Sequence, residues 1–215
     1  MNNNKESTPT LNNPSGMRIQ KILAQNGVGS RREIEKAIIE KRISVNNILA
    51  ELGQSVSASD IITFDGRLVK LNSAKILPRI LIYNKPEGEI VSENDPKGRP
   101  TVFDHLPKIK NSKWISIGRL DFNTSGLLIF TTYGDFANRL MHPRYEIERE
   151  YSVRVLGKLT EDQLSQLTSG IKLEDGLAKF ESIKFKGGEG SNHWYQVTLK
   201  EGRNREVRRL FQFFS

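Results

Sequence analysis

The sequence contains no cysteine, only three histidines, and no apolar run near the ~20 residues that a membrane span needs. Without cysteine there is no disulfide and no thiolate metal site, which agrees with a reducing cytoplasm. His105, His142 and His193 lie far apart, and none begins an HExxH pair, so we expect no metal site. The N-terminus also lacks the basic-then-apolar pattern of a secretory signal. These absences favour a cytoplasmic protein that uses neither metal nor membrane.

The excess of basic residues is the most informative feature of the composition. The formal net charge is +8 at pH 7, and the sequence pI is near 9.7. A surface of this charge attracts polyanions, because each phosphate that it neutralises releases counterions. Nucleic acid is therefore the expected partner. A basic surface without any specific partner is the alternative that charge alone leaves open.

The pattern of polar and apolar residues divides the chain into four parts. Residues 1–16 are rich in Asn, Ser, Thr and Pro, and we expect a disordered tail there. Residues 17–69 form a small basic unit, and residues 70–79 have no clear period and contain proline, as a linker would. Residues 80–215 form a larger domain in which strands outnumber helices. The fold class predicted for this domain is α+β, on a largely antiparallel sheet.

The small unit shows two helices followed by short strands. The first helix ends before Gly27, and Ser30 with Glu33 forms a capping box at the start of the second, which Lys41 and Arg42 close. Asn46-Asn47 separates two short apolar runs and predicts a hairpin turn, since Asn tolerates positive φ; residues 60–64 add another strand. The apolar helix faces are Ile19, Ile22 and Leu23 in the first helix and Ile34, Ala37 and Ile38 in the second.

The larger domain begins with residues 80–83, a run typical of a buried strand. Alternation or β-branched content predicts further strands at 114–117, 127–132, 151–156 and 194–199. Helices are predicted at 135–142, at 161–168 behind a Thr160–Gln163 capping box, and from Arg205 onward. The last helix presents Val207, Leu210, Phe211 and Phe214 on one face. This apolar face stops abruptly at Ser215, which leads us to expect that the protein continues beyond it.

The segment Trp114–Thr132 encloses a polar loop, GRLDFNTSG, between two apolar strands. Strands hold such a loop rigidly, which suits a reactive group such as Asp121. The same residue types also populate ordinary turns, because Asp, Asn, Ser and Thr side chains cap backbone amides. From the pattern alone, an ordinary turn is the favoured interpretation.

Five ordered motifs change that balance. They are YNKPEG (83–88), DPKGRPTVFDHLP (95–107), GRLDFNTSGLLIFTTYGDFANRLMHP (118–143), EREYSVRVLG (148–157) and EGRNREVRRLF (201–211). Together they resemble the pseudouridine synthases that modify bacterial ribosomal RNA. The basic unit is similar to the S4-type RNA-binding module that this family carries at its N-terminus. The resemblance extends from Met17 to Phe211 and implies a small α/β S4-like domain before a catalytic domain.

The resemblance also implies a catalytic site without a cofactor. The family's catalytic aspartate falls on Asp121, its tyrosine on Tyr151 and its basic residue on Arg208. Arg205 and Arg209 lie close to Arg208 and are alternatives for the last position. In this chemistry the carboxylate either attacks C1′ or takes a proton from C2′, and the sequence does not choose. Tyr151 would stack on the extruded base, although a tyrosine at a strand start is more often a packing residue.

Basic side chains in both domains are candidates for RNA contact. In the small domain a solvated charged face is the alternative, and no residue is assigned as a base reader. The candidates are Arg18, Lys21, Arg31, Arg32, Lys41 and Arg42 in the small domain, and Lys85, Lys97, Arg99, Arg119, Arg203 and Arg205 in the large one.

The function implied by the resemblance is isomerisation of a uridine in large-subunit (23S) ribosomal RNA. Nothing in the sequence suggests an assembly larger than a monomer. Two alternatives stay open. One is the same reaction on another ribosomal uridine, including one in the small subunit, since target choice depends on RNA shape. The other is a non-catalytic RNA-binding protein of ribosome assembly. Retention of Asp121, Tyr151 and Arg208 together argues against the second alternative.

Overall fold

A computed structural model describes residues 16–57, 59–71, 77–110 and 112–214. The chain divides into two compact units. Unit 1 contains residues 1–80, 107–115 and 131–134, and unit 2 contains residues 81–106, 116–130 and 135–215. Residues 1–15 of the predicted tail and residues 72–76 of the predicted linker lie outside the described residues.

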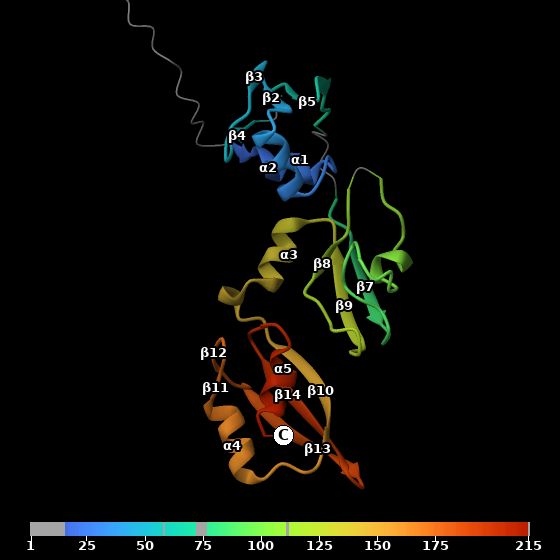
Figure 1. Ribbon diagram of the computed structural model, residues 1–215, viewed down its shortest axis with the longest axis vertical. Coiled ribbons are helices and arrows are strands. Elements are labelled where there is room, and N and C mark those ends of the chain that lie inside the picture. The colour runs from blue at the N-terminus through green and yellow to red at the C-terminus, as the bar shows by residue number, and fades with distance from the viewer. Residues whose placement is uncertain (1–15, 58, 72–76, 111, 215) are drawn as a thin grey trace, which may run out of the picture. The chain divides into compact units, whose positions relative to one another are not determined.

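The N-terminal part of unit 1 packs two helices against short antiparallel strands (Figure 1). Its elements are β1 (Met17–Arg18), α1 (Ile19–Gln25), α2 (Arg31–Ile39), β2 (Ile43–Val45), β3 (Ile48–Leu49), β4 (Ser55–Val56), β5 (Ile62–Phe64) and β6 (Arg67–Leu68). The strands form a four-stranded sheet of order β3-β2-β5-β6 and a small β1-β4 ladder. One apolar core, which includes Ile19, Leu23, Ile34, Ile43 and Ile62, joins helices and sheet.

Local sequence signals explain these elements. The Ser30 side chain accepts from the Glu33 backbone N–H, and the Glu33 carboxylate accepts from the Ser30 N–H, so the predicted capping box is confirmed. Asn46 and Asn47 have φ values of 51° and 67°, as the predicted two-residue turn between β2 and β3 requires. The helix faces predicted from apolar spacing are the buried faces.

A three-stranded sheet of order β7-β9-β8 carries the polar loop. Its strands are β7 (Ile80–Lys85), β8 (Ile115–Ile117) and β9 (Gly126–Thr131). Phe130 is fully buried, and its ring meets Tyr83 and Phe103 edge-on at centroid distances of 6.3 and 5.5 Å. Phe103 belongs to the short 3-10 helix Val102–His105. The expectation that β7 is a buried run is wrong, because its side chains alternate and Ile80 and Ile82 are 56% and 73% exposed.

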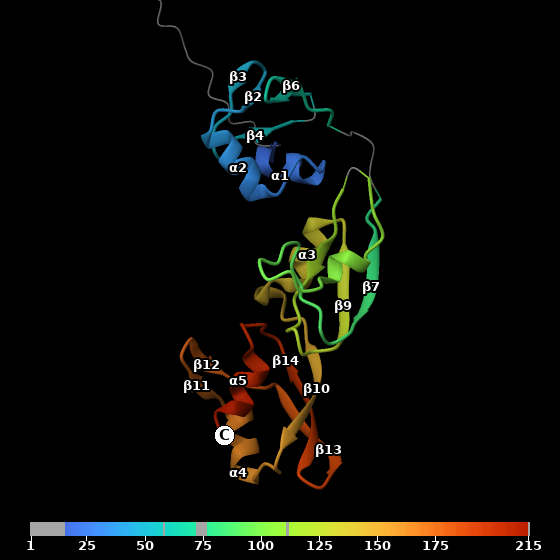
Figure 2. The same ribbon diagram turned by 45° about the vertical axis from the view of Figure 1, so that its right-hand side comes forward.

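The C-terminal part of unit 2 is a second antiparallel sheet, of order β10-β14-β13, with two helices on one of its faces (Figure 2). The buried core contains Leu167, Tyr195, Val197, Leu210 and Phe211, which belong to both helices and to β14. Its elements are α3 (Gly134–Met141), the 3-10 turn Pro143–Tyr145, β10 (Arg149–Leu156), α4 (Glu161–Ser169), β11 (Ile171–Leu173), β12 (Gly176–Ala178), β13 (Ser182–Glu189), β14 (Asn192–Leu199) and α5 (Glu206–Gln212).

The predicted α+β class is confirmed, since helices accompany the sheets and the strands of the β3-β2-β5-β6 and β10-β14-β13 sheets pair antiparallel. The capping box at Thr160 and Gln163 is also confirmed. The sequence interpretation missed strand β13 and the hairpin of β11 and β12. Among the described residues, no helix has both the length and the apolar composition needed to cross a bilayer.

Candidate active site

The loop that carries Asp121 follows β8 and is held in shape by its own backbone. Gly118 and Gly126 flank it with φ values of 85° and 127°, which residues with a side chain rarely adopt. The Ser116 hydroxyl donates to the Gly118 carbonyl, and the Thr124 N–H donates to the Asp121 carbonyl at 3.1 Å. Asp121 therefore lies in a defined turn between two strands of one sheet.

Lys85, at the end of β7, holds this loop through hydrogen bonds to backbone carbonyls. Its side chain is fully buried, and the ammonium donates to the carbonyls of Pro86 and Thr124, both at 2.8 Å. The Gly88 N–H donates to the Phe122 carbonyl at 2.9 Å. Burial lowers the pKa of Lys85, while the nearby carboxylates of Glu89, Glu87 and Asp121 oppose that shift. The sequence analysis placed Lys85 where it could meet the RNA backbone, but its ammonium is turned inward to the loop.

Arg208 on α5 is the main partner of Asp121. Its Nε lies 3.1 Å from Asp121 Oδ2, and its Nη2 donates to the Asn123 carbonyl and the Thr124 hydroxyl, each at 3.2 Å. Arg205 Nη1 is 3.9 Å from the same carboxylate oxygen. The Asp121 side chain is 34% exposed, so the pair lies at the surface of unit 2 and is open to a ligand. No described residue makes a hydrogen bond or ion pair with the other carboxylate oxygen, Oδ1.

Packing, rather than intrinsic stability, holds α5. Leu210 and Phe211 are buried in the core of unit 2, as their predicted face requires. The residue before the helix, Arg205, has a left-handed backbone with φ 50° and gives no side-chain cap. This helix therefore depends on tertiary contacts to set its position.

Tyr151 lies near the start of β10, opposite Val197 of β14. Burial raises the pKa of its hydroxyl, the negative charges of Glu206 and Asp121 add to that shift, and Arg149 opposes it. A neutral phenol can stack on a base and hydrogen-bond to it.

Other basic residues of unit 2 lie around the loop. Arg99 holds Asp95 through two nitrogen–oxygen contacts of 2.9 Å, and its guanidinium is 5.9 Å from the ring centre of Phe122. Phe122 directly follows Asp121 and is 39% exposed. Arg119 is also exposed, two residues before Asp121. The loop thus carries a cation, a carboxylate and an aromatic ring in Arg119, Asp121 and Phe122, and Arg99 lies beside that ring.

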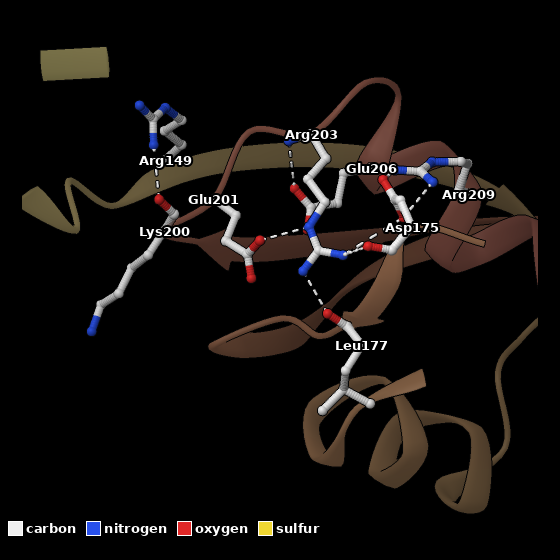
Figure 3. Close-up of polar contacts among 8 residues, drawn as sticks. All are labelled: Arg149, Asp175, Leu177, Lys200, Glu201, Arg203, Glu206 and Arg209. Atoms are coloured by element: carbon white, nitrogen blue, oxygen red, sulfur yellow. Dashed lines mark hydrogen bonds and ion pairs between the residues drawn. The ribbon is translucent and has the colours of Figure 1, made fainter. Parts of the chain in front are cut away.

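Arg203 is engaged within the protein (Figure 3). Its Nε donates to Glu201 at 2.7 Å, one terminal nitrogen donates to the Leu177 carbonyl, and the other lies 3.6 Å from an Asp175 carboxylate oxygen. These contacts favour a structural role over the RNA contact expected from its place in a turn. The sequence interpretation missed Asp175 and Glu206 as members of this cluster. The Asp175-Gly176 dipeptide between apolar runs is a hairpin signal that could have indicated Asp175.

The six basic candidates of unit 1 differ in whether their side chains already make contacts within the protein. Arg42 forms two contacts with Asp65, at 2.7 and 2.6 Å, and Arg18 donates to the Gly53 carbonyl. Arg31, Arg32 and Lys41 are exposed, and Lys21 lies on α1. Arg31, Arg32 and Lys41 are therefore the most available for phosphate. No group of three or more His, Cys, Asp or Glu side chains within the described ranges could hold a metal ion.

A family model described as RNA pseudouridylate synthase matches residues 79–213, and an S4 domain model matches residues 17–62. The first match covers more than half of the chain, so the chain belongs to the RNA pseudouridylate synthase family. The resemblance inferred from the five motifs is confirmed.

Three curated relatives share the printed name ribosomal large subunit pseudouridine synthase B. The Pseudomonas aeruginosa relative is 55% identical over 201 residues, which is 93% of this chain and 52% of the relative. The Pasteurella multocida relative is 56% identical, over 95% of this chain and 61% of its own length. The Escherichia coli K12 relative is 56% identical, over 91% of this chain and 68% of its own. The chain thus spans about half to two thirds of the length of these relatives.

A solved structure gives an independent comparison. A crystal structure titled as a pseudouridylate synthase aligns with a TM-score of 0.59 at 26% sequence identity. The alignment covers 92% of this chain and 83% of the other. The fold similarity therefore extends over most of the chain and agrees with the family assignment.

Proposed function

We propose that this protein converts a specific uridine of bacterial large-subunit ribosomal RNA into pseudouridine. The observation that carries the proposal is the pairing of Asp121 with Arg208 in a loop fixed by the buried Lys85. Membership of the pseudouridylate synthase family supports the reaction. The large-subunit target is supported by the printed names of relatives that are 55–56% identical.

The reaction breaks the N1–C1′ bond of uridine, turns the base, and joins C5 to C1′ in place of N1. The C5 proton leaves and N1 gains one, so no net oxidation occurs and no redox cofactor is required. Asp121 serves either as a nucleophile at C1′ or as a base at C2′. Both roles need an ionised carboxylate with an unengaged oxygen. Arg208 binds the carboxylate at Oδ2, while Oδ1 has no partner among the described side chains.

In the proposal, Tyr151 forms one wall of the site and stacks on the extruded base. Its raised pKa keeps the hydroxyl protonated near neutral pH, so that it can donate a hydrogen bond to the base. Arg99, Arg119 and Arg205 are exposed and lead the phosphate backbone toward Asp121. Phe122 provides a further surface for stacking.

Unit 1 provides the remaining affinity for RNA in this proposal. Its S4 domain match and the exposed Arg31, Arg32 and Lys41 support contact with phosphates. We further propose that the protein acts as a monomer in the cytoplasm, where bacterial ribosomal RNA is made and modified. Modification of small-subunit RNA is the second candidate, because the site residues act on uridine in either RNA.

Mapping of pseudouridine in purified RNA tests this proposal. The chain is incubated with unmodified transcripts of large-subunit and small-subunit RNA, and each uridine is tested for conversion. We expect conversion at one position of the large-subunit transcript. Asp121→Asn should reduce the single-turnover rate by about 10⁴-fold or more, with RNA affinity retained, because the amide neither attacks nor accepts a proton.

Asp162→Asn is a matched control, since Asp162 is an exposed aspartate in the first turn of α4. Its rate should equal that of the unaltered chain. Conversion only in the small-subunit transcript would reassign the target while keeping the reaction. Conversion in neither transcript, or near-normal activity of Asp121→Asn, would refute the proposed function.

A further inference from the structure

We infer that Asp175 is a positioning residue for the active site: it holds α5 at the rotation that brings Arg208 to Asp121. This inference rests on the proposed function. Asp175 lies in the turn between β11 and β12, away from the motif that carries Asp121 in the sequence. The contacts that support the role are drawn in Figure 3.

The helix that carries Arg208 cannot fix its own rotation. It has seven residues, about two turns, and no side-chain cap at its N-terminus. Helices this short are marginal without tertiary contacts. Leu210 and Phe211 anchor one face in the core, but apolar contacts are not directional and define the rotation about the helix axis less finely than a hydrogen-bonded ion pair does. A directional contact is needed to define it.

Asp175 supplies the directional contact. Its two carboxylate oxygens each lie 2.8 Å from a different terminal nitrogen of Arg209, in a bidentate pair. The hairpin that carries Asp175 is itself anchored, because Ile171 and Ala178 at its two ends are buried in the same core as α5. The carboxylate is therefore presented from a fixed support.

Arg203 ties the segment before α5 to the same hairpin. Its guanidinium reaches Asp175 and the Leu177 carbonyl, and its backbone N–H donates to the Glu206 carboxylate at 2.9 Å. Glu206, the first residue of α5, is only 3% exposed, and burial raises its pKa. Asp175 in the turn, Arg203 before α5 and Glu206 at the start of α5 thus form one ion-pair cluster.

Consecutive side chains on a helix point about 100° apart, so Arg209 and Arg208 leave α5 in different directions. One reaches Asp175, and the other reaches Asp121 with Nε at 3.1 Å. A rotation of about 10° moves an atom roughly 6 Å from the helix axis by about 1 Å. A misplacement of about 1 Å at a reacting group can cost as much as 10²-fold in rate. Holding Arg209 therefore sets the position of the guanidinium that acts on the carboxylate.

The test compares Asp175→Asn with Glu174→Gln in the full chain. Glu174 lies in the same turn, is exposed, and makes no hydrogen bond or ion pair with any described residue. Asp175→Asn should lower kcat about 10-fold and change KM for RNA less than about 2-fold, because the inferred role of Asp175 is to position Arg208 and not to bind RNA. Glu174→Gln should leave both constants unchanged. A KM effect as large as the kcat effect, or no kcat effect, would overturn the inference.

A double-variant experiment separates positioning from general loss of structure. Arg208→Lys already lacks the bidentate-capable guanidinium, so adding Asp175→Asn should lower its rate by less than about 2-fold if Asp175 acts through Arg208. An undiminished 10-fold loss in that background would overturn the inference. All rates are measured well below the thermal unfolding midpoints of the variants. Inactivity of the unaltered chain on every ribosomal RNA would instead refute the proposed function.

Discussion

The loop with Asp121 and the hairpin turn with Asp175 each place an aspartate against arginines of α5, but they hold the two carboxylates differently. Both oxygens of Asp175 are engaged by Arg209, and a second arginine, Arg203, stands 3.6 Å away. In Asp121, by contrast, Arg208 and Arg205 both approach the same oxygen, Oδ2. Among the described residues, nothing engages Oδ1.

Two other aspartate–arginine pairs resemble the Asp175 arrangement. Asp65 binds Arg42 through both oxygens, and Asp95 binds Arg99 in the same way. In all three pairs, hydrogen bonds from the arginine lower the pKa of the aspartate. A carboxylate that is engaged on both oxygens can anchor a turn, but it has fewer free lone pairs to offer a substrate. The open geometry of Asp121 suits the proposed chemistry.

The largest effect in this comparison is expected at Arg208. Arg208→Lys keeps the positive charge but cannot reach Asp121, the Asn123 carbonyl and the Thr124 hydroxyl from one planar group. The single-turnover rate should fall about 10²-fold, because the carboxylate loses its orientation. Arg205→Lys, made at the 3.9 Å contact, should cost much less. Equal losses of rate in the two variants would show that Asp121 needs only a nearby positive charge and not the geometry of Arg208.

A smaller effect is expected when the support beneath the loop is removed. Lys85→Met keeps the length of the side chain but leaves the Pro86 and Thr124 carbonyls without their donor. The free energy of unfolding should fall by about 1–3 kcal/mol, the usual cost of leaving buried polar groups unpaired. Lys172→Met, at an exposed lysine of β11, is the matched control and should be neutral. Urea unfolding measures both, and equal stability of the two variants would contradict the support role.

The smallest effect is the dependence on acid pH of the stability that the Asp175–Arg209 ion pair contributes. Because the folded-state pKa of Asp175 is lowered by Arg209, its contribution to stability is present above the unfolded value, near 4. It is lost as the pH falls through the folded-state value. The difference in unfolding free energy between the unaltered chain and Asp175→Asn should be constant above about pH 4 and shrink below it. A difference that stays constant in acid would contradict the ion pair.

Much of the fold could be predicted because local chemistry decides it. The capping boxes at Ser30 and Thr160, the Asn46-Asn47 turn and the apolar face of α5 follow from neighbouring residues. The β11–β12 hairpin was missed although its turn has an Asp-Gly signal. The exposure of Ile82 was also missed, because a short apolar run does not show which face is covered.

The candidate site was only partly predictable for a different reason. The motif resemblance named Asp121, Tyr151 and Arg208 before any geometry was known, and their catalytic roles stay predictions. The inward direction of Lys85 and the network around Asp175 depend on contacts between segments far apart in the chain. A lysine at the end of a strand is usually solvated. The sequence position of Lys85 therefore gave no sign that its ammonium lies among the carbonyls of Pro86, Phe122 and Thr124.

The hydrogen bond between Arg208 and Thr124 joins residues 84 positions apart. Contacts of such long sequence separation form late, because the loop-closure entropy has to be overcome first. The β8–β9 turn and its lysine support belong to earlier parts of the chain and can form before α5 is in place. The carboxylate loop therefore costs less chain entropy to assemble than its pairing with Arg208 on α5. The Asp121–Arg208 pair is the part of the proposed site that depends on the docking of α5.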